Sequence, residues 1–131
     1  MATWTTEQVE ERIVEILGDV PEGVERHHFG RPYLTAYQLA IELDRRYPRI
    51  RTSLSLPLGG ANTGAHNSLA QYVALQLSQR IKADPKYPVE GRMLSNIDVV
   101  AIDYRSAAGD PIRSSLTGSG YDLSMYRLRE A

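Results

Sequence analysis

The segment from Leu34 to Tyr47, LTAYQLAIELDRRY, constrains the fold most strongly, because residue type marks both of its ends and its inner face. Thr35 and Gln38 have the spacing of a capping box, in which two side chains satisfy backbone amides at a helix start. Pro48 cannot continue a helix, so the helix ends by Tyr47. The apolar stripe consists of Ala36, Leu39, Ala40, Leu43 and Tyr47, and a flanking patch of Tyr37 and Ile41. Two apolar faces predict a helix with two neighbours.

Two further helices are predicted, one before and one after this segment. The first begins at Thr5 or Thr6, because Thr5 and Gln8 again have capping-box spacing, and it ends near Gly18. The other begins at Asn67 or Ser68 and runs to about residue 83. Its apolar side contains Leu69, Ala70, Val73, Ala74, Leu77 and Ile81, and its other side Gln71, Leu75, Ser78, Gln79 and Lys82. The second set is therefore expected to face solvent.

Strands are predicted from alternation and from β-branched runs. Residues 50–56 alternate apolar and polar side chains, which is typical of a half-buried strand. A short strand is expected at 29–33, and a strand buried on both faces at 97–105. Residues 121–128 are predicted to pair with this last strand, and residues 84–91, rich in turn residues, to form a linker. The intervening segment 106–120 is predicted to be a long loop.

The order of these elements resembles a winged helix-turn-helix domain, and LTxxQLAxxL is similar to the first helix of many helix-turn-helix units. The resemblance implies an α+β, winged-helix-like fold, with three helices packed on a small antiparallel sheet. It also implies that the third helix enters the major groove of DNA and that the loop after Arg105 is a wing. The interval from Pro48 to about His66 exceeds the usual turn of about 3–4 residues. Either a strand and loop are inserted there, or the helices are not a helix-turn-helix pair.

Charge is unevenly distributed along the chain, although the net charge is only −1. Residues 1–25 contain seven acidic residues and one basic residue, whereas residues 26–131 contain fourteen basic and nine acidic residues. Such asymmetry is typical of a protein with a polyanionic partner. Alternatively, the acidic first helix packs near basic loops and neutralises them. The length of 131 residues fits a single domain over 1–131.

The candidate DNA-binding residues come from a basic cluster, the third helix and the wing. They are Arg45, Arg46, Arg49, Arg51, Ser68, Gln71, Tyr72, Ser78, Gln79, Lys82, Arg105 and Arg113. Arginine contacts phosphate or guanine, glutamine pairs with adenine, and an arginine on a wing can enter a minor groove. Solvated surface positions are the alternative for each residue. We predict a protein that binds duplex DNA, such as a transcriptional regulator or a nucleoid- or defence-associated factor. The alternative is a protein–protein interaction module, and a homodimer fits either function.

Several chemistries are disfavoured by the residues that the sequence lacks. Without cysteine there is no disulfide, thiolate nucleophile or zinc–thiolate site. The loop PLGGANTGAHNS lacks the lysine of a P-loop, and His27, His28 and His66 lack a metal-ligand spacing such as HExxH. We therefore expect no catalytic residues, metal or cofactor, and predict that the protein is not an enzyme. No apolar run approaches the roughly 18 residues of a membrane helix, and no leader is evident, so we expect a cytoplasmic protein.

Overall fold

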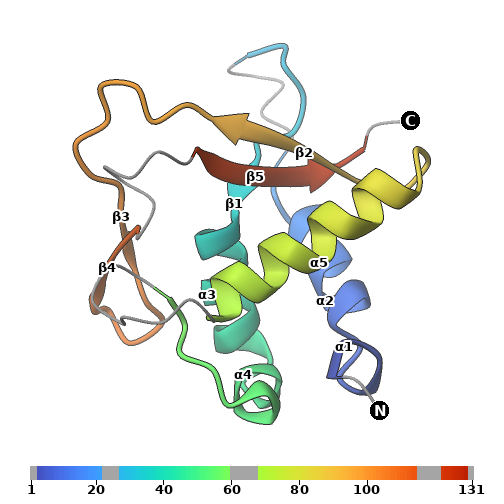
Figure 1. Cartoon of the computed structure of the whole chain (residues 1–131), viewed down its shortest axis with the longest axis vertical. Helices are drawn as coiled ribbons and strands as arrows, with labels where there is room; N and C mark the ends of the chain where they lie inside the picture. The colour runs from blue at the N-terminus through green and yellow to red at the C-terminus, as the bar shows by residue number, and fades with distance from the viewer. Residues whose placement is uncertain (1–2, 22–26, 60–67, 115–121, 130–131) are drawn as a thin grey trace.

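Helices and short antiparallel strands make up the computed structural model, which describes residues 3–21, 27–59, 68–114 and 122–129 (Figure 1). The helices are α1 (Thr3–Thr6), α2 (Val9–Gly18), α3 (Ala36–Arg46), α4 (Arg49–Leu54) and α5 (Leu69–Ala83). The strands are β1 (Leu34–Thr35), β2 (Val89–Leu94), β3 (Asp103–Arg105), β4 (Pro111–Arg113) and β5 (Leu123–Leu128). The predicted α+β class is confirmed.

Three strands form the main sheet, in the order β1-β5-β2, and all neighbours are antiparallel. The pairing of β2 with β5 runs without interruption from Val89 opposite Leu128 to Leu94 opposite Leu123. β3 and β4 form a separate hairpin in the connection between these two strands. Figure 1 shows β2 and β5 side by side above α5, with the hairpin at one end of the sheet.

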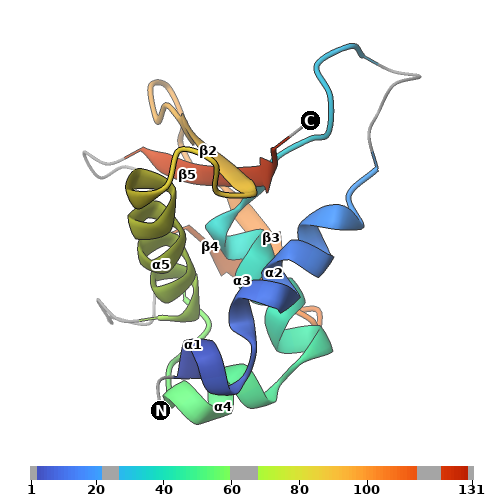
Figure 2. The ribbon, with the colours of Figure 1, turned by 90° about the vertical axis from the view of Figure 1, so that its right-hand side faces the viewer.

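The core lies between the helices and the sheet, and α3 occupies its centre. α3 packs against α2 on one side and against α5 on the other (Figure 2). The predicted capping box is confirmed, because the Gln38 amide donates to the Thr35 hydroxyl and the Thr35 amide donates to the Gln38 side chain. Leu39, Ala40 and Leu43 are fully buried. The two neighbours expected from the sequence are therefore present.

The limits and the buried face of α5 also match the sequence prediction. Ser68 caps the helix, since its hydroxyl accepts a hydrogen bond of 3.1 Å from the Gln71 amide. Leu69, Val73 and Leu77 are fully buried against the core. The preceding residues 60–67, including His66 and Asn67, lie outside the described residues.

The predicted strand over residues 50–56 is wrong, because Arg49–Leu54 forms the helix α4. Ile50 is buried, and Leu54, four residues later, packs against the same core. A spacing of four residues places both side chains on one helical face, so alternation in so short a segment fits either structure. The first helix, predicted to begin at Thr5 or Thr6, instead begins at Thr3 and is divided into α1 and α2. Gln8 separates the two helices in a left-handed conformation with φ 54°, and its side chain makes no capping hydrogen bond to α2.

The predicted strand over residues 97–105 is wrong for most of its length. Only Asp103–Arg105 is a strand there, and Ile97 and Val100 are 76% and 92% exposed. The partner of β5 is instead β2, whose first half, residues 89–91, lies in the segment predicted to be a linker. The short strand expected at 29–33 is also wrong, since none of these residues is a strand and β1, at Leu34–Thr35, lies just after them. Strand pairing depends on distant residues, which local patterns do not report.

Candidate binding surfaces

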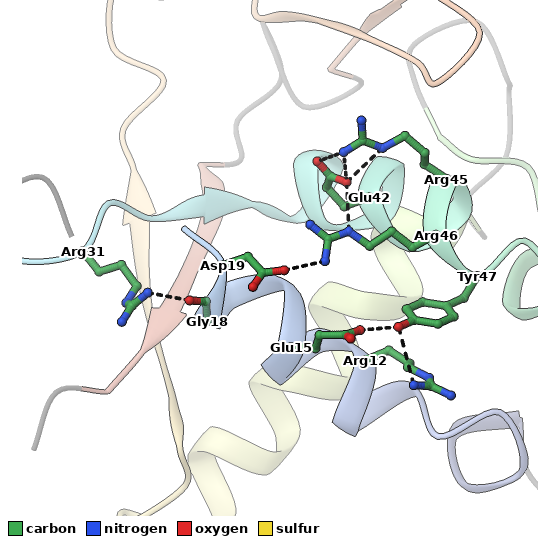
Figure 3. Close-up of polar contacts among 9 residues, drawn as sticks. All are labelled: Arg12, Glu15, Gly18, Asp19, Arg31, Glu42, Arg45, Arg46 and Tyr47. Atoms are coloured by element: carbon green, nitrogen blue, oxygen red, sulfur yellow. Dashed lines mark hydrogen bonds and ion pairs between the residues drawn. The ribbon is translucent and has the colours of Figure 1, made fainter. Parts of the chain in front are cut away.

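The basic cluster predicted to contact DNA is paired with carboxylates. Arg46 donates to Asp19 at 2.7 Å, and its Nε lies 3.5 Å from the Glu42 carboxylate. Arg45 is also hydrogen-bonded to Glu42, through both oxygens of the carboxylate (Figure 3). Asp19 follows α2, so this contact ties the end of α3 to α2, on the opposite side of α3 from α5.

The other two arginines of the cluster have acidic partners as well. Arg49 lies 3.6 Å from Glu7, and Arg51 donates to Asp44 at 2.8 Å. Each positive charge is therefore largely compensated by a negative charge a few ångströms away, which weakens the field that attracts phosphate. Two of the partners come from the acidic N-terminal segment. This arrangement corresponds to the alternative in which that segment neutralises basic residues.

A tyrosine extends the polar contacts between α2 and α3. The Tyr47 hydroxyl is hydrogen-bonded to the Glu15 carboxylate, and the Arg12 guanidinium stacks 4.3 Å from the centre of the Tyr47 ring (Figure 3). The hydrogen bond to Glu15 raises the pKa of Tyr47 above its usual value. The sequence places Tyr47 in the apolar stripe of its helix but predicts neither contact, because the partners are 32 and 35 positions away.

Three of the predicted DNA contacts on α5 have structural roles. Ser68 is buried as the helix cap. The Ser78 hydroxyl lies 3.2 Å from that of Tyr126 on β5, and the Tyr72 ring packs 6.1 Å from that of Trp4. Burial raises the pKa of Tyr72. The remaining predicted contacts are Gln71, Gln79 and Lys82, which are exposed. These three give the outer side of α5 a polar character with a single charge.

The predicted wing, residues 106–120, contains β4, which pairs with β3 at the end of the strand predicted over 97–105. Arg113 pairs with Asp103, directly opposite on the neighbouring strand, at 2.9 Å. The hydrogen bond from Arg113 lowers the pKa of Asp103. Arg105 is exposed at the end of β3. Residues 115–120, the rest of the predicted wing, and Tyr121, the first residue of the strand predicted over 121–128, lie outside the described residues.

A network that the sequence did not predict joins β2 to β5 and to the segment before β1. Glu90 accepts hydrogen bonds from Arg127 at 2.9 Å and from Tyr33 at 3.1 Å. The Arg127 guanidinium stacks 4.6 Å from the centre of the Tyr33 ring and donates to the Phe29 and Arg31 carbonyls. Burial alone would raise the pKa of Glu90, but the hydrogen bonds from Arg127 and Tyr33 lower it overall.

Exposed apolar side chains follow one another at the end of β2 and in the residues after it. Met93 and Leu94 are 60% and 40% exposed, and Ile97 and Val100 are more exposed still. We call residues 93–100 the apolar segment. Figure 1 shows it leaving the end of β2 toward the β3–β4 hairpin. Soluble proteins seldom expose apolar side chains so close together unless the surface binds a partner.

Metal and membrane sites are not found in the part of the chain that the structure describes. There, no three histidine, aspartate or glutamate side chains gather as metal ligands. None of the helices among the same residues has both the length and the apolar character needed to cross a bilayer. A scan against protein-family models, a search of curated proteins and a search of solved structures each returned no match for this chain.

Proposed function

We propose that the protein is a protein–protein interaction module of winged-helix type, and that it binds its partner through the apolar segment and the adjoining edge of β2. The observation that carries this proposal is the exposure of Met93, Leu94, Ile97 and Val100 within eight residues. Burying these side chains against a partner removes apolar surface from water, at roughly 25 cal/mol for each Å². The pairing of the basic cluster with acids favours this function over binding to DNA.

The order of the elements supports the winged-helix part of the proposal. The chain begins its main fold with a helix (α2) and a short strand (β1), followed by two longer helices (α3 and α5). A strand (β2), a hairpin and a last strand (β5) come after them. The last strand lies between the other two strands of the sheet. In this arrangement α4 and the residues after it form an insertion between the second and third helices. The fold itself does not determine the partner.

Site-specific photo-crosslinking tests the proposed surface. We expect a photoreactive amino acid at Val100 to give a protein adduct in cells, and the same group at Gln79 on α5 to give none. The partner is then identified by mass spectrometry and purified. Ile97→Asp should weaken its affinity at least about tenfold, because it places a charge in an apolar interface. Leu75→Asp, a matched change at an exposed leucine of α5, should leave the affinity unchanged. Equal effects of both changes would contradict the proposal.

Binding to duplex DNA is a second candidate, favoured by the exposed polar side of α5. Gln71, Gln79 and Lys82 are exposed on the helix that takes the third-helix position. A gel-shift series on random duplex DNA at low and moderate salt tests this function. Salt-sensitive binding that is lost in Gln79→Ala/Lys82→Ala and kept in Arg46→Ala would support it. The absence of binding at low salt would exclude it.

A further inference from the structure

Methionine supplies the only sulfur in this chain, because the sequence contains three methionines and no cysteine. The structure describes two of them, Met93 on β2 and Met125 on β5. Met93 is 60% exposed, whereas Met125 is partly buried. Peroxides oxidise a thioether that solvent reaches faster than one that the fold shields. The fold therefore makes Met93 the more reactive of these two side chains.

The places of the two methionines in the main sheet explain this difference. Met125 lies on the central strand, opposite Thr35 of β1 and Arg92 of β2, so it has a neighbour on each side. Met93 lies on the edge strand β2, where Ser124 is its one cross-strand partner among the described residues. Within the same part of the chain, Met93 belongs neither to the buried core nor to the partly buried apolar side chains packed against it. A chemical change at Met93 thus leaves the described core intact.

Met93 is also the first side chain of the apolar segment. Leu94 follows it, and Ile97 and Val100, which are 76% and 92% exposed, complete the set. An unbranched thioether adapts its shape to a partner, and methionine is therefore common in surfaces that bind other proteins. Oxidation adds one oxygen to the sulfur and turns this apolar side chain into a polar one. The more reactive described methionine is thus part of the proposed interface.

We propose that Met93 is a reversible oxidation site, and that its sulfoxide weakens the binding of the protein partner to the apolar segment. The inference rests on the proposed function and deepens it by adding its regulation. A sulfoxide oxygen accepts hydrogen bonds from water, and an interface that fits a thioether supplies no donor in their place. The oxidised side chain therefore either loses these bonds or keeps the two surfaces apart, and both weaken the complex.

The oxidant is hydrogen peroxide or an organic hydroperoxide. A lone pair of the Met93 sulfur attacks the terminal peroxide oxygen, the O–O bond breaks and an S–O bond forms. The sulfur loses two electrons and the peroxide gains them. The proton of the transferred oxygen passes to the departing oxygen, which leaves as water or an alcohol. Methionine sulfoxide reductases reverse the oxidation, with one enzyme for each sulfoxide epimer.

Peptide mass spectrometry during treatment with hydrogen peroxide tests the site on the purified full chain. We expect Met93 to gain an oxygen at least about fivefold faster than Met125, because solvent reaches more of its side chain. In concentrated urea the two rates should converge, since unfolding removes the difference in exposure. Far-UV circular dichroism of the oxidised chain should match that of the untreated chain. Equal rates in the folded chain would overturn the proposal.

The effect on binding is measured with the partner identified through the Val100 photo-adduct, after the chain alone is oxidised and the peroxide removed. The affinity of the wild type should fall about tenfold, the effect of one buried polar group without a hydrogen-bond partner. Met93→Leu, a volume-conserving change that removes the sulfur, should bind equally well before and after peroxide. Met125→Leu is the matched control, and it should lose affinity on oxidation as the wild type does.

Two further measurements test reversibility and protection. A methionine sulfoxide reductase with a thiol reductant should restore the affinity of the oxidised chain. Binding should in turn slow the oxidation of Met93, because a partner that covers the apolar segment removes this side chain from solvent. The rate for Met125 should be the same in the free chain and in the complex. A complex that leaves the rate for Met93 unchanged would contradict the proposal.

The outcomes separate this inference from the proposed function. A partner that binds the oxidised and the untreated chain equally well would overturn the regulation at Met93 and leave the proposed function standing. The same holds if oxidised Met93→Leu loses as much affinity as the wild type. If no photo-adduct forms at Val100, the proposed function and this inference both fail.

Discussion

At the scale of single residues, Glu90 is a carboxylate whose environment departs strongly from water. Its side chain is 12% exposed and accepts from Arg127 and Tyr33. We predict that Glu90→Gln lowers the free energy of unfolding by about 1.5–3 kcal/mol at neutral pH, the range for hydrogen bonds to charged groups. Urea unfolding of both proteins measures this difference.

The pH dependence of that difference follows from the lowered pKa of Glu90 in the folded state. A carboxylate with a depressed folded pKa stabilises the fold above its unfolded pKa of about 4.3. The stabilisation is lost as the pH falls through the lower, folded value. The difference in the free energy of unfolding between wild type and Glu90→Gln should therefore be largest at neutral pH and disappear in acid. A gap independent of pH would show that the substitution perturbs packing instead of charge.

Residue types alone identified the charged groups but not their partners. The sequence placed Arg46 in a basic cluster, whereas its nearest carboxylate, Asp19, is 27 positions away. No local spacing reports such a contact. Ser68 was recognised as a cap, because its partner Gln71 is only three positions away. In the structure Ser68 acts as a helix cap, and its predicted contact with DNA stays a prediction.

At the scale of elements, the sequence predicts those whose ends are marked by local chemistry. α3 and α5 begin at the expected caps, and α3 ends before Pro48. β2 was missed because Pro88 and Gly91 are typical of turns, and its strand conformation depends on partners in β5 that are 29 (123 − 94) to 39 (128 − 89) positions away. α4 was mistaken for a strand because six residues are too few to separate a period of two from one of 3.6.

Substitution of an exposed residue in α4 distinguishes the two interpretations of that segment. Ser53 is exposed in α4. Alanine favours a helix over valine by up to about 0.7 kcal/mol, whereas valine is favoured in strands. We predict that Ser53→Ala is more stable than Ser53→Val in thermal unfolding. A more stable valine variant would support the strand predicted from the sequence.

At the scale of the whole molecule, the residues that connect β2 to β5 take no part in the pairing of these two strands. Leu94 lies opposite Leu123, so a two-residue turn can join the strands directly. Replacing residues 95–122 by Asn-Gly, a preferred hairpin turn, shortens the loop and lowers its closure entropy by roughly 2 kcal/mol. The same change removes Tyr104, whose ring stacks on that of the buried Tyr37 at 5.2 Å. It also removes Ile102 and Ile112, which are partly buried against the core.

The loss of these three side chains costs more than the shorter loop gains, since fully burying one such side chain contributes roughly 1.5–3 kcal/mol. We therefore predict that the shortened chain still unfolds in a single cooperative transition but is less stable than the wild type. Tyr104→Ala in the full-length chain is the control, and it should be the more stable of the two variants because it keeps Ile102 and Ile112. A shortened chain that unfolds without cooperativity would mean that the hairpin is an integral part of the core, and that the helices and the three-stranded sheet alone are not the stable unit.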